Sequence, residues 1–172
     1  AGSADRLLTA AGQKVFAKAV SHGLNGPSAA LHAREAEIAA MLPASMPVPK
    51  FLGRIRWDDW EALIFDQAPG VNPQLPWGAD ELIRVLDTLA QLADQQPAGI
   101  TSLLPALEVD LREDASGFAR IMADEWIPAD PWLAQSLEAL HELAFEGIGA
   151  LAGNQLVHTD LRSDNILLGE DG

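Results

Sequence analysis

The sequence predicts an α+β fold in which a small β-rich segment with one helix precedes a mainly helical segment. Alternating apolar and polar residues near the N-terminus indicate paired strands, whereas apolar residues beyond Trp77 recur at helical spacing. A stretch rich in proline and glycine, residues 67–77, separates the two patterns and suits a linker. We therefore divide the chain into residues 1–66, the linker 67–77 and residues 78–172.

The N-terminal segment contains two expected hairpins around one helix. Residues 6–20 form two strands that turn at Ala10-Ala11-Gly12-Gln13. Ser28 is a suitable N-cap for a helix over residues 28–42, which Pro43 ends. Residues 50–56 and 61–66 form the second pair of strands, joined by a polar turn.

The remaining chain is predicted to be helical up to its last strand. Apolar stripes indicate helices over residues 82–92 and from residue 133 towards Gly153, and a weaker acidic helix over 113–126. The glycines between 147 and 153 follow no strand, so we interpret them as close helix packing and not as a dinucleotide loop. Residues 166–168 are expected to form a short apolar strand.

Composition and charge exclude several classes of protein. Hydrophobic residues make up 48% of the 172 residues and charged residues 21%, which excludes a disordered chain. The absence of cysteine excludes a disulfide framework and a zinc–thiolate site, and favours a cytoplasmic compartment. No stretch approaches the roughly 18 apolar residues of a membrane span, so no membrane partner is expected.

The distribution of charge suggests two different ligands. A formal net charge of −14 argues against nucleic acid as a partner, because phosphate backbones are bound by clustered Lys and Arg. Up to Trp57, seven basic residues face three acids, whereas the rest of the chain is strongly acidic. Either this is an ordinary soluble surface, or the basic segment handles an anion and the acidic segment receives a cation.

The most informative motif lies in residues 156–168, where the order His-x-Asp-Leu-x-x-x-Asn is framed by apolar residues. This is the kinase catalytic-loop pattern. In it, the aspartate, here Asp160, orients the substrate hydroxyl and accepts its proton, and the asparagine, here Asn165, holds a magnesium ion. Flanking buried strands would keep the two side chains fixed. The alternative is a polar turn between two buried strands, with His158 as a core histidine.

Two upstream residues fall in the order that this chemistry requires. Lys18 lies on the second strand of the first hairpin, where a kinase keeps the lysine that grips the α- and β-phosphates. Glu35 lies on the apolar side of the following helix, so its carboxylate can face Lys18. Glu37 lies on the other side of that helix and is the less suitable partner.

Together these segments resemble the aminoglycoside phosphotransferase family, small-molecule kinases with a protein-kinase-like bilobal fold. The resemblance implies that residues 1–66 form a nucleotide-binding lobe and residues 78–172 a helical lobe. It implies binding of ATP by Lys18 and Glu35, and adenine recognition by the backbone of a hinge comprising Asp66, Gln67 and Ala68. It further implies catalysis by Asp160 and a magnesium ion held by Asn165.

The chain also departs from the family pattern. The family has a second acidic magnesium ligand on a strand shortly after the catalytic loop, and the sequence stops before such a strand. We therefore expect a partial chain, truncated after the catalytic loop. Arg162 stands where family members usually have a small residue, and we expect it to contact the transferring phosphate.

The expected function is transfer of the ATP γ-phosphate to a hydroxyl of a small molecule. Acidic residues predominate between Glu108 and Asp130, where the family builds its acceptor site, and favour a cationic acceptor such as an aminoglycoside. Such an enzyme would confer antibiotic resistance. Macrolides, choline-like amines and sugar derivatives would also fit as acceptors. The same motifs would suit a non-catalytic kinase-like module that binds nucleotide or a protein partner. They would suit a protein kinase less well, because Thr159 replaces the arginine that protein kinases carry before the catalytic aspartate.

Overall fold

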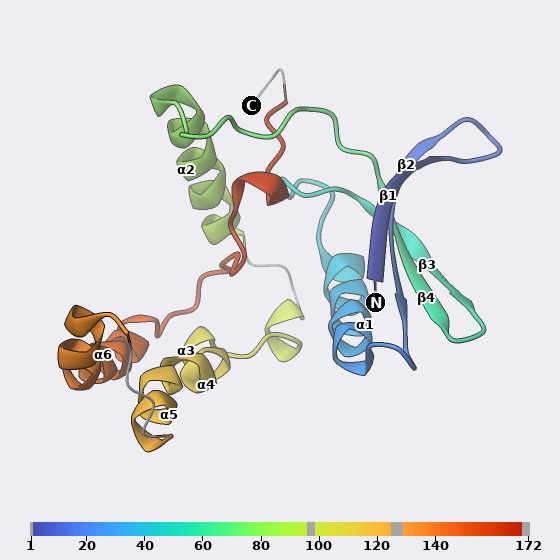
Figure 1. Ribbon diagram of the computed structural model, residues 1–172. Helices are drawn as coiled ribbons and strands as arrows, with labels where there is room; N and C mark the ends of the chain where they lie inside the picture. The colour runs from blue at the N-terminus through green and yellow to red at the C-terminus, as the bar shows by residue number, and fades with distance from the viewer. Residues whose placement is uncertain (1, 96–98, 125–128, 170–172) are drawn as a thin grey trace. The chain divides into compact units, whose positions relative to one another are not determined.

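The computed structural model describes residues 2–95, 99–124 and 129–169 (Figure 1). It has the α+β fold that the sequence predicts, and its strands form one four-stranded antiparallel sheet. The chain divides into two compact units, one comprising Ala1–Leu103 with Gln155–Gly172 and the other Leu104–Asn154. These units are not the lobes drawn from the sequence at residues 66 and 78, and that division stays a prediction.

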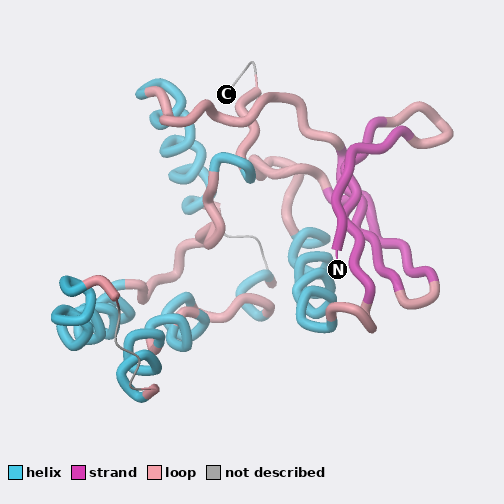
Figure 2. The backbone as a smooth tube through the Cα atoms, in the orientation of Figure 1, coloured by secondary structure: helices cyan, strands magenta, loops and turns pink. Residues whose placement is uncertain are grey.

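The sheet is built from two hairpins, and both were expected from the alternating pattern (Figure 2). The strands are β1 (Gly2–Leu8), β2 (Lys14–Ser21), β3 (Phe51–Trp57) and β4 (Trp60–Asp66), in the spatial order β1-β2-β4-β3. Every neighbouring pair is antiparallel. The central strands β2 and β4 therefore supply most of the sheet's buried side chains, among them Val15, Val20, Leu63 and Phe65.

Helix α1 (Gly26–Met41) packs against β2, β3 and β4 (Figure 1). Ala29 and Ala36 are its buried residues, and Ala36 joins Leu63 and Phe65 in the hydrophobic core. The expected N-cap at Ser28 is wrong. The helix begins earlier, with Pro27 in its first turn, and the side chain of Asn25 accepts a hydrogen bond from the Ser28 backbone N–H at 3.1 Å.

Asp59 ties the β3–β4 turn to the end of β2. Its carboxylate accepts hydrogen bonds from the Ser21 hydroxyl and, at 3.0 Å, from the Gly23 N–H. The hydrogen bond from Ser21 and, to a smaller extent, that from Gly23 hold the pKa of Asp59 below its usual value. The carboxylate is therefore ionised at neutral pH, and it fixes the connection that leads from β2 into α1.

Beyond the sheet the chain is helical, as expected, and only its middle part is divided into short helices. The helices are α2 (Ala79–Asp94), α3 (Leu107–Asp110), α4 (Arg112–Ala115), α5 (Gly117–Ala123) and α6 (Pro131–Ala150). The expected single helix over 113–126 is wrong, because the chain breaks at Ser116, whose hydroxyl donates to the Glu113 carbonyl at 2.5 Å. Residues 125–126 of that helix lie outside the described residues.

The interpretation of the late glycines as close packing is also wrong. A Cβ built on Gly147, Gly149 or Gly153 would meet no atom within 4 Å in the described part of the chain. These positions therefore face open space within their unit. Among the described residues, no helix combines the length and the apolar character needed to cross a membrane.

The cap of α1 can be tested with two neighbouring substitutions. Asn25→Ala removes the acceptor for the Ser28 N–H and should lower the free energy of unfolding by about 1 kcal/mol. Ser28→Ala removes a side chain that does not cap the helix and should change it by less than about 0.5 kcal/mol. Urea unfolding followed by circular dichroism measures both values. A larger loss in Ser28→Ala than in Asn25→Ala would restore Ser28 as the cap.

Candidate functional site

The first cluster of the candidate site joins Lys18 on β2 to Glu35 on α1. The Lys18 Nζ lies 2.5 Å from one carboxylate oxygen of Glu35 and 2.6 Å from the other. Lys18 pairs with Leu63 in the sheet register, and its ammonium group lies 5.5 Å from the centre of the Phe65 ring. Both charged side chains are about one-third exposed, at 30% and 37%. The lysine is thus held in one orientation and is still open to a ligand.

His32 lies one turn before Glu35 on α1 and does not add to the charge of this cluster. Burial lowers the pKa of His32, and this effect outweighs the carboxylate of Glu35, which raises it. Its Nδ1 is buried and has no hydrogen-bond partner among the described residues. The imidazole is therefore neutral at pH 7, and Lys18 and Glu35 are the charged residues of the cluster.

The expected hinge continues directly from the end of β4. The backbone N–H of Asp66 donates to the Lys50 carbonyl at 2.8 Å, and that of Gln67 donates to the Lys14 carbonyl at 3.4 Å. The side chain of Gln13 donates to the Asp66 carboxylate at 2.8 Å. The Ala68 N–H has no hydrogen bond within the described residues. Of the three hinge amides, that of Ala68 is therefore the one left to donate to a ligand.

The second cluster contains Asp160, Arg162 and Asn165. The Asn165 amide donates to the Asp160 carboxylate at 2.8 Å and to its backbone carbonyl at 3.1 Å. The Arg162 Nε lies 3.4 Å from the other carboxylate oxygen of Asp160, and its guanidinium donates to Asp164 at 2.9 Å. The Asp160 side chain is 63% exposed. Its carboxylate is thus oriented by two neighbours and is accessible to a substrate.

The strands expected on both sides of this loop are mostly absent, and that expectation is wrong. Val157 lies outside any strand and is half exposed. After the 3-10 turn Ser163–Asn165, residues 166–168 form a single antiparallel bridge, Val71 with Leu168. The next hydrogen-bonded pair of such a ladder would need a backbone donor at Pro73, and proline has none. The ladder therefore stops after one pair.

The structure brings the linker and α2 to residues 156–169, the segment with the catalytic-loop pattern, here called the catalytic-loop segment, through residues that the sequence did not single out. The Asn72 amide donates to the carbonyls of Ser163 and Ile166 at 3.1 and 2.8 Å. Arg84 on α2 donates to the Gly169 carbonyl at 2.6 Å. Gly70 has φ +120°, and a Cβ there would lie 2.6 Å from the Leu168 carbonyl oxygen. Only glycine fits this approach.

No sequence signal identifies Asn72, because all of its partners are backbone carbonyls. Every residue has a backbone carbonyl, so these hydrogen bonds require no particular residue type at the partner positions. The two clusters lie in the same compact unit, but no hydrogen bond or ion pair joins Lys18 or Glu35 directly to Asp160 or Asn165 in the described ranges. They are linked along the chain by β4, the hinge and Asn72.

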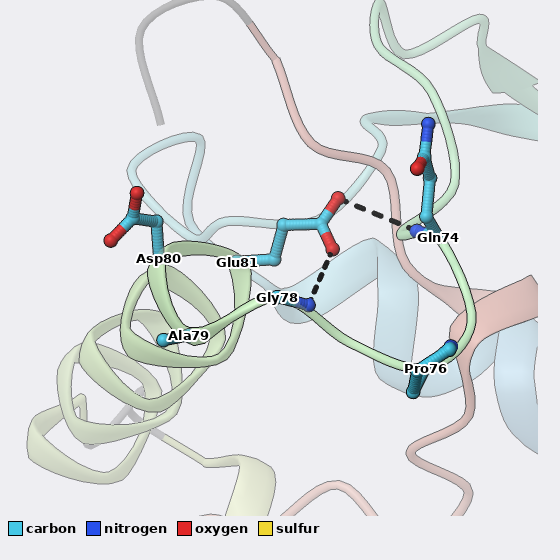
Figure 3. A pocket seen from close by; sticks show the side chains of 6 residues that line it. All are labelled: Gln74, Pro76, Gly78, Ala79, Asp80 and Glu81. Atoms are coloured by element: carbon cyan, nitrogen blue, oxygen red, sulfur yellow. Dashed lines mark hydrogen bonds between the residues drawn. The ribbon is translucent and has the colours of Figure 1, made fainter.

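A shallow pocket of about 380 Å³ opens at the start of α2, beside the linker (Figure 3). The Glu81 side chain turns back to accept hydrogen bonds from the backbone N–H groups of Gly78 and Gln74 at 3.1 and 3.4 Å, whereas Asp80 points away. Its lining contains no residue of either cluster. We interpret it as the capped beginning of a helix.

Comparison with known proteins gave no family for the chain. No protein-family model and no curated protein matches the sequence. The two clusters and the segment between them are therefore the features of the molecule that bear on its function.

Proposed function

We propose that the protein transfers the γ-phosphate of ATP to a hydroxyl group of a small molecule, as the resemblance to the aminoglycoside phosphotransferases implies. We likewise propose the protein-kinase-like bilobal arrangement of that family. The observation that carries the proposal is the pairing in one compact unit of Lys18 with Glu35 and of Asp160 with Asn165. Each pair consists of the residue types that phosphoryl transfer requires, and the two pairs occur in the required chain order.

In this proposal Lys18 binds the α- and β-phosphates of ATP. The bidentate contact with Glu35 fixes the ammonium group, so that little side-chain freedom is lost when the nucleotide binds. The free Ala68 N–H suits an acceptor nitrogen of the adenine ring, and the Asp66 and Gln67 amides stay committed to the sheet. The hinge thus positions the base while Lys18 holds the phosphates.

Asp160 orients the acceptor hydroxyl and takes its proton as the phosphoryl group is transferred. The carboxylate accepts from Asn165 through one oxygen, and each of its oxygens retains a lone pair for a further donor. Its high exposure allows the acceptor to approach. Arg162, already beside Asp160, would contact the transferring phosphate and balance its charge.

The amide of Asn165 fits the role of a magnesium ligand. Its NH₂ group donates to the Asp160 carboxylate, which can only accept, so its carbonyl oxygen is left for a hard cation. The described residues contain no group of three or more His, Cys, Asp or Glu side chains that could hold a metal. Magnesium often keeps water and phosphate oxygens as most of its ligands, so one protein oxygen is a compatible contribution. When bound, the ion neutralises charge on the phosphates.

The acceptor is proposed to be a cationic small molecule of the aminoglycoside type, handled in the cytoplasm. The acids that favour it lie on separate short helices, with Glu108 and Asp110 on α3 and Glu113 on α4. Asp130 is used otherwise, since its carboxylate caps α6 by accepting from Trp132 and Leu133. The side chain of Asp114 and all of Glu125 lie outside the described residues.

The role of the first cluster is tested by two glutamates on the same helix. Glu35→Ala frees Lys18 and should weaken Mg·ATP binding about 10–100-fold, because a charge-assisted hydrogen bond contributes about 1.5–3 kcal/mol. Glu37→Ala removes an exposed carboxylate of the same charge and should leave the affinity within about twofold. Isothermal titration calorimetry measures both. Equal Mg·ATP affinities in the two variants would show that Glu35 does not contribute to nucleotide binding.

The role of Asp160 is tested by phosphate transfer in the full-length gene product, with a panel of cationic and neutral acceptors. Asp160→Asn should lower kcat by about 10²–10⁴-fold, because the hydroxyl loses its general base, while Mg·ATP affinity is retained. Asp164→Asn changes an exposed carboxylate of the same loop and should cost less than about fivefold, the limit for a surface ion pair.

Two results would contradict the proposal. Undiminished transfer by Asp160→Asn would remove this residue from the chemistry. Tight Mg·ATP binding by the unaltered gene product with no transfer to any acceptor would identify a nucleotide-binding module instead.

A further inference from the structure

The Asn72 side chain of the linker donates hydrogen bonds to three backbone carbonyls of the catalytic-loop segment. Its amide nitrogen lies 3.1 Å from the Ser163 carbonyl oxygen, 3.4 Å from that of Asp164 and 2.8 Å from that of Ile166. Ser163 and Asp164 belong to the 3-10 turn Ser163–Asn165, and Ile166 follows it directly. One side chain of the linker therefore fixes the turn that carries Asn165.

Asn72 takes this role because the residue that follows it is Pro73. Val71 and Leu168 exchange two backbone hydrogen bonds, of 3.2 and 2.8 Å, and a ladder would continue with Pro73 opposite Ile166. Pro73 has no N–H, so the Ile166 carbonyl would lose its backbone donor. The Asn72 amide donates to that carbonyl instead. Its second hydrogen is then left for the Ser163 carbonyl on the other side of the turn.

Hydrogen bonds connect this turn to Asp160. Within the turn the Asn165 N–H donates to the Arg162 carbonyl at 3.0 Å, and the Asn165 side chain donates to Asp160. A change in the position of the turn thus moves Asn165, and with it the hydrogen bond that orients the Asp160 carboxylate. Asn72 itself contacts neither a proposed ligand atom nor Asp160.

We propose that Asn72 is a positioning residue that fixes Asn165 and Asp160 relative to the nucleotide-binding hinge. Asn72 lies four residues after Ala68, the last residue of that hinge. This inference rests on the proposed phosphotransferase function. The hinge positions the nucleotide, and Asn72 attaches the catalytic turn to the same stretch of chain. Its loss should therefore reduce the rate of transfer and leave nucleotide affinity unchanged.

The role depends on the two hydrogens of the amide. An alanine at position 72 removes the donors and leaves three carbonyls without their side-chain partner. An aspartate of nearly the same shape offers only acceptors and places negative charge against those carbonyls. Asn72→Asp should consequently lower kcat more than Asn72→Ala does. If only side-chain volume mattered, the order would be the opposite, because aspartate is nearly the size of asparagine.

The experiment compares Asn72→Ala, Asn72→Asp and the control Gln74→Ala in the full-length gene product. Gln74 is another exposed amide of the linker, and its side chain has no hydrogen bond to the described residues. Asn72→Ala should lower kcat by about 10–100-fold and raise the half-saturating Mg²⁺ concentration, as is typical when a residue that orients a ligand is lost. The affinity for ATP in the absence of Mg²⁺ should change by less than about twofold, because Lys18 and Ala68 are untouched, and Gln74→Ala should behave as the unaltered protein.

A double-mutant cycle with Asn165→Ala separates positioning from general destabilisation. If Asn72 acts through Asn165, Asn72→Ala should reduce kcat by less than about threefold in the Asn165→Ala background. Hydrogen exchange provides a measure that does not depend on activity. The amides of Asn165 and Leu168 should exchange faster in Asn72→Ala, and those of Val20 and Leu63 in the sheet core should not.

The outcomes distinguish this inference from the proposed function. Unchanged kcat and unchanged exchange in Asn72→Ala, or fully additive losses in the cycle, would overturn the role of Asn72 in an active kinase. If the unaltered protein binds Mg·ATP without transferring phosphate, and Asn72→Ala still accelerates exchange in the turn, the proposed function fails. Asn72 then stands as the residue that holds this turn.

Discussion

The antiparallel pairing of β2 with β4 is the constraint on which the rest of the candidate site depends. Its register sets Lys18 opposite Leu63, on strands packed against α1, where Glu35 can reach the ammonium group. The same pairing ends at Val15 and Asp66, so β4 runs without interruption into the hinge. A shift of one residue would turn Lys18 to the opposite face and separate it from Glu35.

The sheet that carries Lys18 and the segment that carries Asp160 are stabilised by different interactions. Leu63 and Val20 are fully buried, and burial of each such side chain stabilises the sheet by about 1.5–3 kcal/mol. The catalytic-loop segment has little apolar burial, since Val157 and Leu161 are exposed. It is held by polar contacts from Asn72 and Arg84 and by the bridge at Val71. Lys18 is therefore fixed by the core, whereas Asp160 depends on hydrogen bonds to the backbone.

The sequence predicted the elements whose signal is periodic and missed those that depend on single contacts. Both hairpins and α1, α2 and α6 follow from alternation or helical spacing, and the Lys18–Glu35 contact followed from strand and helix geometry. The cap at Asn25 was missed because Ser28 is an equally good cap by residue type. The last strand was overestimated because apolar residues 166–168 look like a strand, although Pro73 leaves them one bridge. Asn72 could not be found, since its partners are carbonyls.

In the proposed function one bound Mg·ATP engages both clusters, which backbone NMR of the isotope-labelled protein can follow during titration with Mg·ATP. Chemical-shift changes are expected at Lys18, Ala68 and Asn165, following one common binding curve. Glu37, on the exposed side of α1, should shift least. Shifts confined to Lys18 and Ala68, with Asn165 unmoved at saturation, would show that the nucleotide engages the first cluster without the second. The absence of shifts at all three residues would show that the nucleotide engages neither cluster.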